Sequence, residues 1–372
     1  MRGRLFRSAG AAASLGAAAA AAAAAASASR LSQAESASEA AARLPPATEL
    51  GLNRGSSFAC FRPNGERAAL SEIIAAAEKA DVVLLGETHD DPVAHQLQLY
   101  LLMMAQQSKP CVLSLEMFER DVQPVIDEYL AGLIREKDLM QDARPWANYE
   151  SDYRPMVEFC RQHGMPVIAA NVPRRYVGAV GRLGAKKLAD GSWPAASHAF
   201  MPPLPLPKPS AGYLAHLMAD PAILRTDQIG LQLGPEEDEE APPAPALSME
   251  AAAAAGKCPY IGLSKRDGLL QPMLLWDAGM AHSIAAALEA HPGHLVFHVC
   301  GSFHCEGFHG ITEMLNAYRP QARVLVVIVY AESDCDTFVP ERHAGQADFV
   351  LLADARLPRS HDYFEAPTAE QK

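Results

Sequence analysis

Several common catalytic and metal-binding motifs are missing from this sequence. It has no C-x-x-C, which excludes the commonest zinc-ribbon and thioredoxin-like sites, and no H-E-x-x-H zinc motif. It also lacks the G-x-S-x-G turn that carries the nucleophile of many serine hydrolases. Its seven cysteines are odd in number and irregularly spaced, so a disulfide framework is not expected.

Basic charge is scarce beyond the N-terminal region. After residue 45 the chain carries 27 basic and 42 acidic residues, a formal charge of −15. Such a chain will not bind nucleic acid by neutralising phosphates, so nucleic acid is not an expected partner. The ten-alanine run at 17–26 is too short and too weakly apolar to be a membrane span.

Residues 1–45 have the composition of a targeting leader. No acidic residue precedes Glu35, and arginines are scattered through an Ala/Ser-rich segment. This pattern predicts a disordered organellar transit peptide, with the chloroplast favoured over the mitochondrion. A secretory signal is the alternative, because Ala26-Ser27-Ala28 has the form of an A-x-A cleavage site.

The rest of the chain alternates apolar runs with segments of helical length. We predict strands at residues 81–86, 111–118, 166–173, 295–300, 324–330 and 348–352. Continuous apolar strands that alternate with helices predict an α/β fold with a predominantly parallel sheet covered by helices. A helix should follow the first strand, with Asp91 as its N-cap and Pro92 in its first turn.

The α/β domain is predicted in two parts, residues 46–195 and 291–355, followed by a polar tail at 356–372. Residues 196–290 predict a helical subdomain inserted before the fourth strand. It contains a Pro-rich stretch and an acidic, Pro/Ala-rich insertion at 234–256 that we expect to be disordered.

Polar residues follow several predicted strands directly. Glu87 and His89 come after the first strand, Glu116 lies in the second, and His304 follows the fourth. Because ligands of open α/β sheets bind beyond the carboxyl ends of the strands, we expect these side chains to converge. They could hold a divalent transition metal that activates water, or a histidine could act as general base without metal. Supporting polar residues are expected to be Asp90, Asn171, Arg174, Arg175 and Ser302.

Each of these residues also has a purely structural interpretation. The Glu87-Thr88-His89 segment could be a turn before a helix, and His304 could be a loop histidine. Glu116 could form an ion pair with Arg174 or Arg175, since a partly desolvated carboxylate needs a partner.

The segment 294–310 holds four histidines and two cysteines. We interpret His298 as a hydrogen-bonded core histidine and Cys300 as core packing, because both lie in the apolar strand. Cys305 and His309 are then neighbours of the site around His304.

The predicted helical subdomain contains four candidates for a haem ligand: Tyr213, His216, Met218 and Met273. The alternative for each is packing in or beside the core.

Five blocks of the sequence resemble the ChaN-like family of haem-binding uptake proteins: DVVLLGETHDDPVAHQLQLYLL, SLEMFERDVQPVIDEYL, DYRPMVEFCRQHGMPVIAANVPR, QPMLLWDAGMAHSIAAAL and GSFHCEGFHGITEML. The resemblance runs from about Ala80 to Tyr330 and implies haem bound between helices of a homodimer. The wider group includes Tiki proteases, TraB-like proteins and erythromycin esterase. Its metal-dependent proteases imply a role for Glu87, His89, Glu116 and His304. The chain has no lipobox cysteine, so a lipoprotein setting is not implied.

Two functions therefore stand as hypotheses. The first is a haem- or iron-handling binding protein whose ligand is haem or another small molecule. The alternative is a metal-dependent hydrolase that uses the residues at the strand ends. A third interpretation is a scaffold without ligand or activity.

Overall fold

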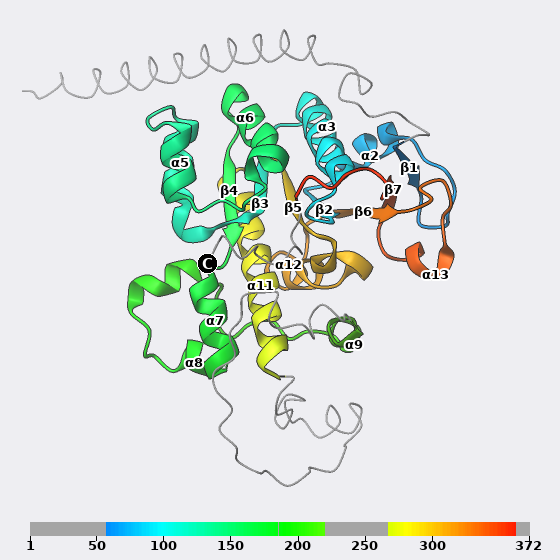
Figure 1. The fold of residues 1–372 in the computed structure, drawn as a ribbon. Coiled ribbons are helices and arrows are strands. Elements are labelled where there is room, and N and C mark those ends of the chain that lie inside the picture. The colour runs from blue at the N-terminus through cyan, green and yellow to red at the C-terminus, as the bar shows by residue number, and fades with distance from the viewer. Residues whose placement is uncertain (1–56, 185, 220–266, 362–372) are drawn as a thin grey trace, which may run out of the picture. The chain divides into compact units, whose positions relative to one another are not determined.

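Seven strands form one sheet in the computed structural model, which describes residues 57–184, 186–219 and 267–361 (Figure 1). The strand order is β1-β7-β6-β2-β5-β3-β4, and all neighbours are parallel except β1 and β7. The predicted α/β fold class is confirmed. The strands are β1 (Phe58–Phe61), β2 (Val82–Glu87), β3 (Cys111–Glu119), β4 (Val167–Asn171), β5 (Leu295–Gly301), β6 (Val324–Glu332) and β7 (Phe349–Asp354).

Six of these strands were predicted, and β1 was missed. β1 has only four residues and pairs antiparallel with β7 at the edge of the sheet. A run of four residues is too short to show a strand period, so its sequence alone does not separate it from a loop.

Helices cover both faces of the sheet (Figure 1). α2, α3 and α6 lie on one face, and α7, α11 and α12 lie on the other. The α-helices are α2 (Leu70–Ala77), α3 (Pro92–Ser108), α4 (Gln123–Leu130), α5 (Glu136–Asp142), α6 (Arg154–His163), α7 (Arg174–Leu183), α8 (Lys186–Ala189), α9 (Ala211–Ala219), α11 (Asp267–Ala290), α12 (Ile311–Tyr318) and α13 (Pro340–His343). Shorter helical turns are η1 (Arg120–Val122), η2 (Tyr149–Tyr153), η3 (Ala195–Phe200), η4 (Ser302–His304) and η5 (Glu306–Phe308).

The helix after β2 begins as predicted. Asp91 Oδ1 accepts hydrogen bonds from the backbone N–H groups of Val93 (2.9 Å) and Ala94 (3.3 Å), and Pro92 occupies the first turn. A capping carboxylate satisfies donors that have no partner within the helix, so this turn is anchored directly beside the end of β2.

α11 belongs to the region predicted as a helical subdomain, but it packs on the sheet. It contacts β4 and β5, and it lies between α7 and α12. Gly279 permits this close approach, because a Cβ at that position would lie 2.2 Å from Val172 Cγ2. α11 therefore brings its side chains to the same sheet that carries the strand-end residues.

Three predicted features lie outside the described residues. They are the leader at 1–45, the acidic insertion at 234–256 and the last part of the tail at 362–372. Among the residues that are described, no helix is both long and apolar enough to cross a membrane.

The central three strands bring the predicted site residues together. β5 lies between β2 and β3, so the ends of the first, second and fourth predicted strands are adjacent. Glu87 is in register with Gly301, and Leu115 is in register with Val299. Because the order of strands changes direction here, this is the edge at which an open α/β sheet binds ligands.

Candidate functional site

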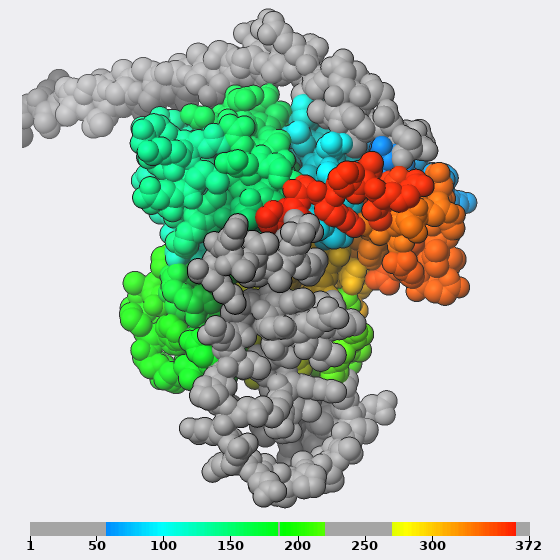
Figure 2. Space-filling view, viewed as in Figure 1, coloured from blue at the N-terminus to red at the C-terminus, as the bar shows by residue number. Residues whose placement is uncertain are grey.

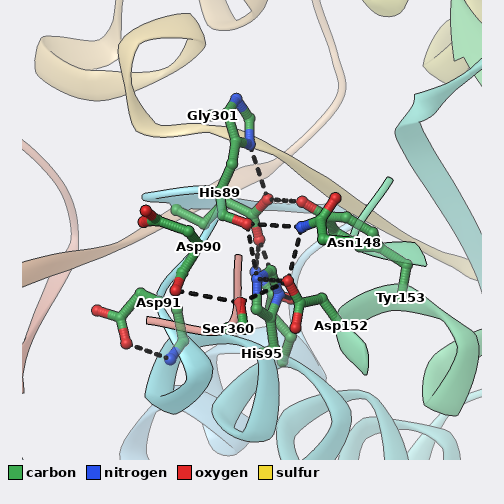
Figure 3. Close-up of polar contacts among 12 residues, drawn as sticks. His89, Asp90, Asp91, His95, Asn148, Asp152, Tyr153, Gly301 and Ser360 are labelled. Carbon is green, nitrogen blue, oxygen red and sulfur yellow. Dashed lines mark hydrogen bonds and ion pairs between the residues drawn. The ribbon is translucent and has the colours of Figure 1, made fainter. Parts of the chain in front are cut away.

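Glu116 links β3 to Gly301, the last residue of β5. Gly301 donates its backbone N–H to Glu116 Oε2 at 2.8 Å. A Cβ on residue 301 would lie 3.0 Å from the His89 ring, so a side chain here would displace His89 or the strand end. Figure 3 shows Gly301 beside His89 at the end of the strands. The glycine thus lets His89 approach the carboxylate of Glu116.

Glu87 ends β2 and is buried, with 2% of its surface exposed. Its Oε1 accepts from the Tyr153 hydroxyl at 2.5 Å and lies 2.9 Å from His89 Nδ1. Its Oε2 accepts from the Gln98 amide. Three donors around a desolvated carboxylate hold it in one position, so Glu87 orients the His89 ring.

His95 extends the network from α3. Its Nδ1 lies 3.3 Å from Glu87 Oε2, and its Nε2 lies 3.3 Å from Asp152 Oδ2. The same two nitrogens also contact Gln98 Oε1 and the His89 carbonyl, each at 3.0 Å. Burial disfavours a charged ring and would lower the pKa of His95. The negative charges of Glu87 and Asp152 outweigh burial and raise this pKa to about 9. His95 is therefore an imidazolium at neutral pH.

Asp152 is held by groups from distant parts of the chain (Figure 3). Its Oδ2 accepts from Asn148 Nδ2 at 2.6 Å and from Ser360 Oγ at 2.7 Å. Asn148 also donates to the His89 carbonyl at 2.8 Å. Ser360 donates its backbone N–H to the Asp90 carbonyl at 3.0 Å. The segment at 356–361 thus contributes directly to the site, and Figure 2 shows it in red across one face of the protein.

His304 lies on the other side of Glu116. Its Nδ1 is 2.5 Å from Asp277 Oδ1, and its Nε2 is 3.5 Å from Glu116 Oε1. Tyr213, from α9, donates its hydroxyl to Asp277 Oδ2. Asp277 is fully buried in α11, so the region once predicted as a separate helical part supplies the partner of His304.

The charges of the buried groups follow from these contacts. Burial would lower the pKa of His304, but Glu116 and Asp277 raise it well above its usual value. Burial would raise the pKa of Glu116, but His304 and His89 hold it far below its usual value. The pKa of His89 is also raised, because its hydrogen bond to Glu87 and the charge of Glu116 outweigh burial.

Carboxylates and imidazoles thus alternate along one continuous arrangement. We call it the carboxylate–histidine series; its members are Asp152, His95, Glu87, His89, Glu116, His304 and Asp277. His89 is its accessible member, with 32% of its side chain exposed. The edge of the Trp146 ring meets the His89 ring with centroids 4.8 Å apart, and the Arg174 guanidinium lies over Trp146. A ligand that reaches the series meets His89 first.

The four residues predicted to bind a metal are not arranged as ligands of one ion. Both ring nitrogens of His304 face carboxylates, and both oxygens of Glu87 accept hydrogen bonds. In the described part of the chain, no group of three or more His, Cys, Asp or Glu side chains is placed to hold a metal ion. The four residues do converge, but they converge as charge partners of one another.

Neither arginine expected near the site forms an ion pair with the series, although the Arg174 guanidinium lies over Trp146 beside His89. Arg175 contacts Asp121, and the backbone N–H of Arg174 donates to Glu119 Oε1 at 3.2 Å. The structural alternative in which Glu116 pairs with Arg174 or Arg175 is wrong. The partners of Glu116 come from β5 and η4 instead, because β5 inserts next to β3 in the sheet.

The other supporting residues have local roles. Asp90 is buried; its carbonyl accepts from Ser360, and its carboxylate lies 3.6 Å from Arg359 Nη1. Asn171 Oδ1 accepts from the adjacent Val172 N–H at 2.9 Å, so it shapes the end of β4. Ser302 is half-buried and begins η4, the turn that presents His304.

The four haem-ligand candidates differ in exposure. Tyr213 and Met273 are buried, with Tyr213 bonded to Asp277. His216 is half-buried against Phe303, and its Nε2 is 3.2 Å from the Phe303 carbonyl. Met218 is 38% exposed. Of the four, Met218 is the most exposed to solvent.

The remaining residues of 294–310 are largely structural. His298 is fully buried; its Nδ1 is 2.9 Å from Ser114 Oγ, and burial lowers its pKa to about 3. The interpretation of His298 and Cys300 as core residues is confirmed. Cys305 is also buried, with its Sγ 4.0 Å from that of Cys300. His309 contacts Glu313 at 2.7 Å and is not part of the series.

Sequence analysis missed three charged members of the series: His95, Asp152 and Asp277. Asp277 had a signal, since it is a lone carboxylate within the apolar stretch LLWDAGM and had to find a partner on burial. His95 and Asp152 had none of comparable strength, because a polar residue on a helix is usually solvent-exposed.

One known protein family matches most of the folded chain. A family model described as "Haem-binding uptake, Tiki superfamily, ChaN" matches residues 73–315. This chain belongs to that family. The matched range contains β2, β3, β4 and β5 and all seven members of the carboxylate–histidine series. Ser360, which donates to Asp152, lies outside it.

Several solved structures are similar to this chain at low identity. The structure titled "Cofacial heme binding to ChaN of Campylobacter jejuni" is 16% identical, covers 81% of this chain and 99% of its own, and has a TM-score of 0.48. A Bacillus cereus protein is 11% identical over 83% and 98% of the two chains, with a TM-score of 0.41. The erythromycin esterase EreC in its open conformation is 11% identical over 74% and 77%, with a TM-score of 0.38. No curated protein matches the chain.

Proposed function

We propose that this protein binds haem. The observation that supports the proposal is its membership in the haem-binding uptake family, with a match over residues 73–315. The match spans the central strands and most of the described helices, so it concerns the folded body rather than one short motif.

Titration of the full-length protein with haemin tests this proposal. We expect a saturable change in the Soret band with a defined stoichiometry, measured against haemin in buffer and against an unrelated acidic protein. A spectrum that stays that of free haemin throughout the titration would contradict haem binding.

A second candidate is acid–base hydrolysis without a metal, and the carboxylate–histidine series favours it. When His89 is neutral, its Nδ1–H donates to Glu87, and Nε2 is then the basic nitrogen. His304 lies between Asp277 and Glu116, whose carboxylates face both of its ring nitrogens, so the role of base in this candidate falls to His89.

Hydrolysis of an activated ester such as p-nitrophenyl acetate tests this candidate in the presence of a chelator. We expect His89→Asn to reduce the rate by about 10²–10⁴-fold, because it removes the general base. His163→Asn is the matched control, since His163 is half-buried and its Nδ1 contacts only the Phe159 carbonyl among the described groups. Equal rates in the wild type and His89→Asn would exclude His89 as the base.

A further inference from the structure

A pocket lies between the segment at 188–205 and helix α11. Its volume is about 680 Å³, within the range of sites that take small organic ligands. Its walls are mainly apolar, with Leu188, Met201 and Leu204 among prolines 202, 203 and 205. Two imidazoles interrupt this apolar lining, His198 from η3 and His282 from α11. The pocket is separate from the carboxylate–histidine series, whose members do not line it.

Arg120 lies beside His282 and has no counter-ion among the described residues. Arg120 donates to Ser283 Oγ at 2.8 Å, to the Gly279 carbonyl and to His282 Nδ1 at 3.3 Å. None of the carboxylates in the described residues contacts it. Burial lowers the pKa of Arg120 to about 10, so it still carries its charge at neutral pH. A cation taken from water without an anion is unfavourable, which makes this end of the pocket attractive to a negative group.

The positive charge of Arg120 can act on a bound ligand through the His282 ring. Burial and the charge of Arg120 lower the pKa of His282, so its ring is neutral. Because Arg120 can only donate, Nδ1 is the acceptor and the ring proton is on Nε2. The neighbouring Tyr318 ring meets His282 edge-on, and the Tyr318 hydroxyl has no hydrogen-bond partner in the described structure. His282, which lines the pocket, thus carries its ring proton on Nε2, and the charge of Arg120 polarises the ring.

We propose that this pocket holds the apolar ring of haem and that His282, supported by Arg120, binds one of its propionate carboxylates. An apolar cavity with a positively polarised donor at one wall fits a flat apolar molecule with a carboxylate at its edge. The identity of the ligand rests on the proposed haem-binding function, whereas the apolar carboxylate chemistry rests on the pocket itself. Arg120 and His282 would make the pocket prefer a ligand with a free carboxylate over one without.

Paired variants of the full-length protein test the pocket. We expect His282→Leu to raise the Kd for haemin about tenfold or more, because a hydrogen bond to a charged group is lost. His291→Leu, at the end of the same helix and away from the pocket, should bind haemin as the wild type does. Ala199→Trp fills the pocket from an exposed position and should abolish binding. Ala195→Trp, exposed in the same 3₁₀ turn but not in the pocket wall, should not.

Esterified haemin provides a test that does not depend on a loss of stability. The wild type should bind the dimethyl ester about tenfold more weakly than haemin, and His282→Leu should remove this preference. A variant that merely unfolds locally would weaken both ligands equally.

The outcomes separate the pocket from the proposed function. Haemin binding that survives in His282→Leu and Ala199→Trp, but is lost in His216→Ala or Met218→Leu, would overturn the pocket and leave haem binding in place. Absence of binding in the wild type would overturn both. Binding of a long-chain fatty acid but not of haemin, sensitive to the same pocket variants, would overturn haem as the ligand.

Discussion

Glu116 Oε1 in β3 lies 3.5 Å from Nε2 of His304, the last residue of η4, although 188 positions separate the two residues in the sequence. The same carboxylate also acts on His89 across the end of β5. The buried negative charge of Glu116 therefore raises the pKa of both histidines. This sharing is possible because β5 inserts between β2 and β3 and brings three strand ends into contact.

Replacement of Glu116 by Gln should lower the pKa of both His89 and His304. The substitution keeps the shape of the side chain but removes the negative charge that raises both values. NMR titration of the imidazole protons measures the two pKa values directly. Glu313→Gln, which alters a carboxylate that contacts His309 outside the series, is the control and should leave both unchanged. If the pKa of one histidine stays constant in Glu116→Gln, the shared charge is wrong.

The stabilising contribution of His95 should be lost as the pH rises above neutral, so the protein should become less stable. Its folded-state pKa of about 9 lies above the unfolded value of about 6.5, so its contribution is fully present below pH 6.5 and is lost as pH rises through 9. The difference corresponds to about 3 kcal/mol of unfolding free energy. Denaturant unfolding between pH 6 and pH 10 measures it.

His95→Asn should flatten that pH profile between 6.5 and 9, because it removes the group that releases the proton. His163→Asn should retain the slope of the wild type. A slope that is the same in both variants would assign the pH dependence to another group.

Gly301→Ala should destabilise the protein and move the His89 ring. The added Cβ would lie 3.0 Å from that ring, and overpacking of this kind costs about 1–3 kcal/mol. Gly178→Ala in α7 is a contrasting change, because its nearest neighbour is the end of Arg182 at 3.4 Å. It should leave His89 in place and stabilise the helix by about 0.5–1 kcal/mol. Thermal unfolding and the His89 NMR signals distinguish the two.

Tyr213 and Asp277 should show energetic coupling in a double-mutant cycle. Tyr213→Phe removes a hydrogen bond to a charged group and should cost about 1.5–3 kcal/mol. Asp277→Asn should cost at least as much, because it also removes a counter-charge of His304. Since the two side chains share that bond, the double variant should be less destabilised than the sum. Strict additivity would contradict the contact.

The strand-end residues could be predicted from sequence because their positions depend on a regular rule. Glu87, His89 and His304 follow apolar strands, and parallel strands end on the same edge. Their charge partners obey no such rule. Asp277 reaches His304 because α11 lies on the sheet with Gly279 against Val172, and His95 reaches Asp152 because α3 packs beside η2. These contacts depend on how helices pack, which local sequence patterns do not encode.

The contact between Ser360 and Asp90 has a consequence for biosynthesis. The two residues are 270 positions apart, so Asp90 and Asp152 enter the growing chain long before the residue that binds both. At about 5–20 residues per second, translation of that interval takes on the order of ten seconds to a minute. Until then, Asp152 and the Asp90 carbonyl lack the hydrogen bonds that Ser360 donates. This support of the carboxylate–histidine series is therefore added late in the production of the protein.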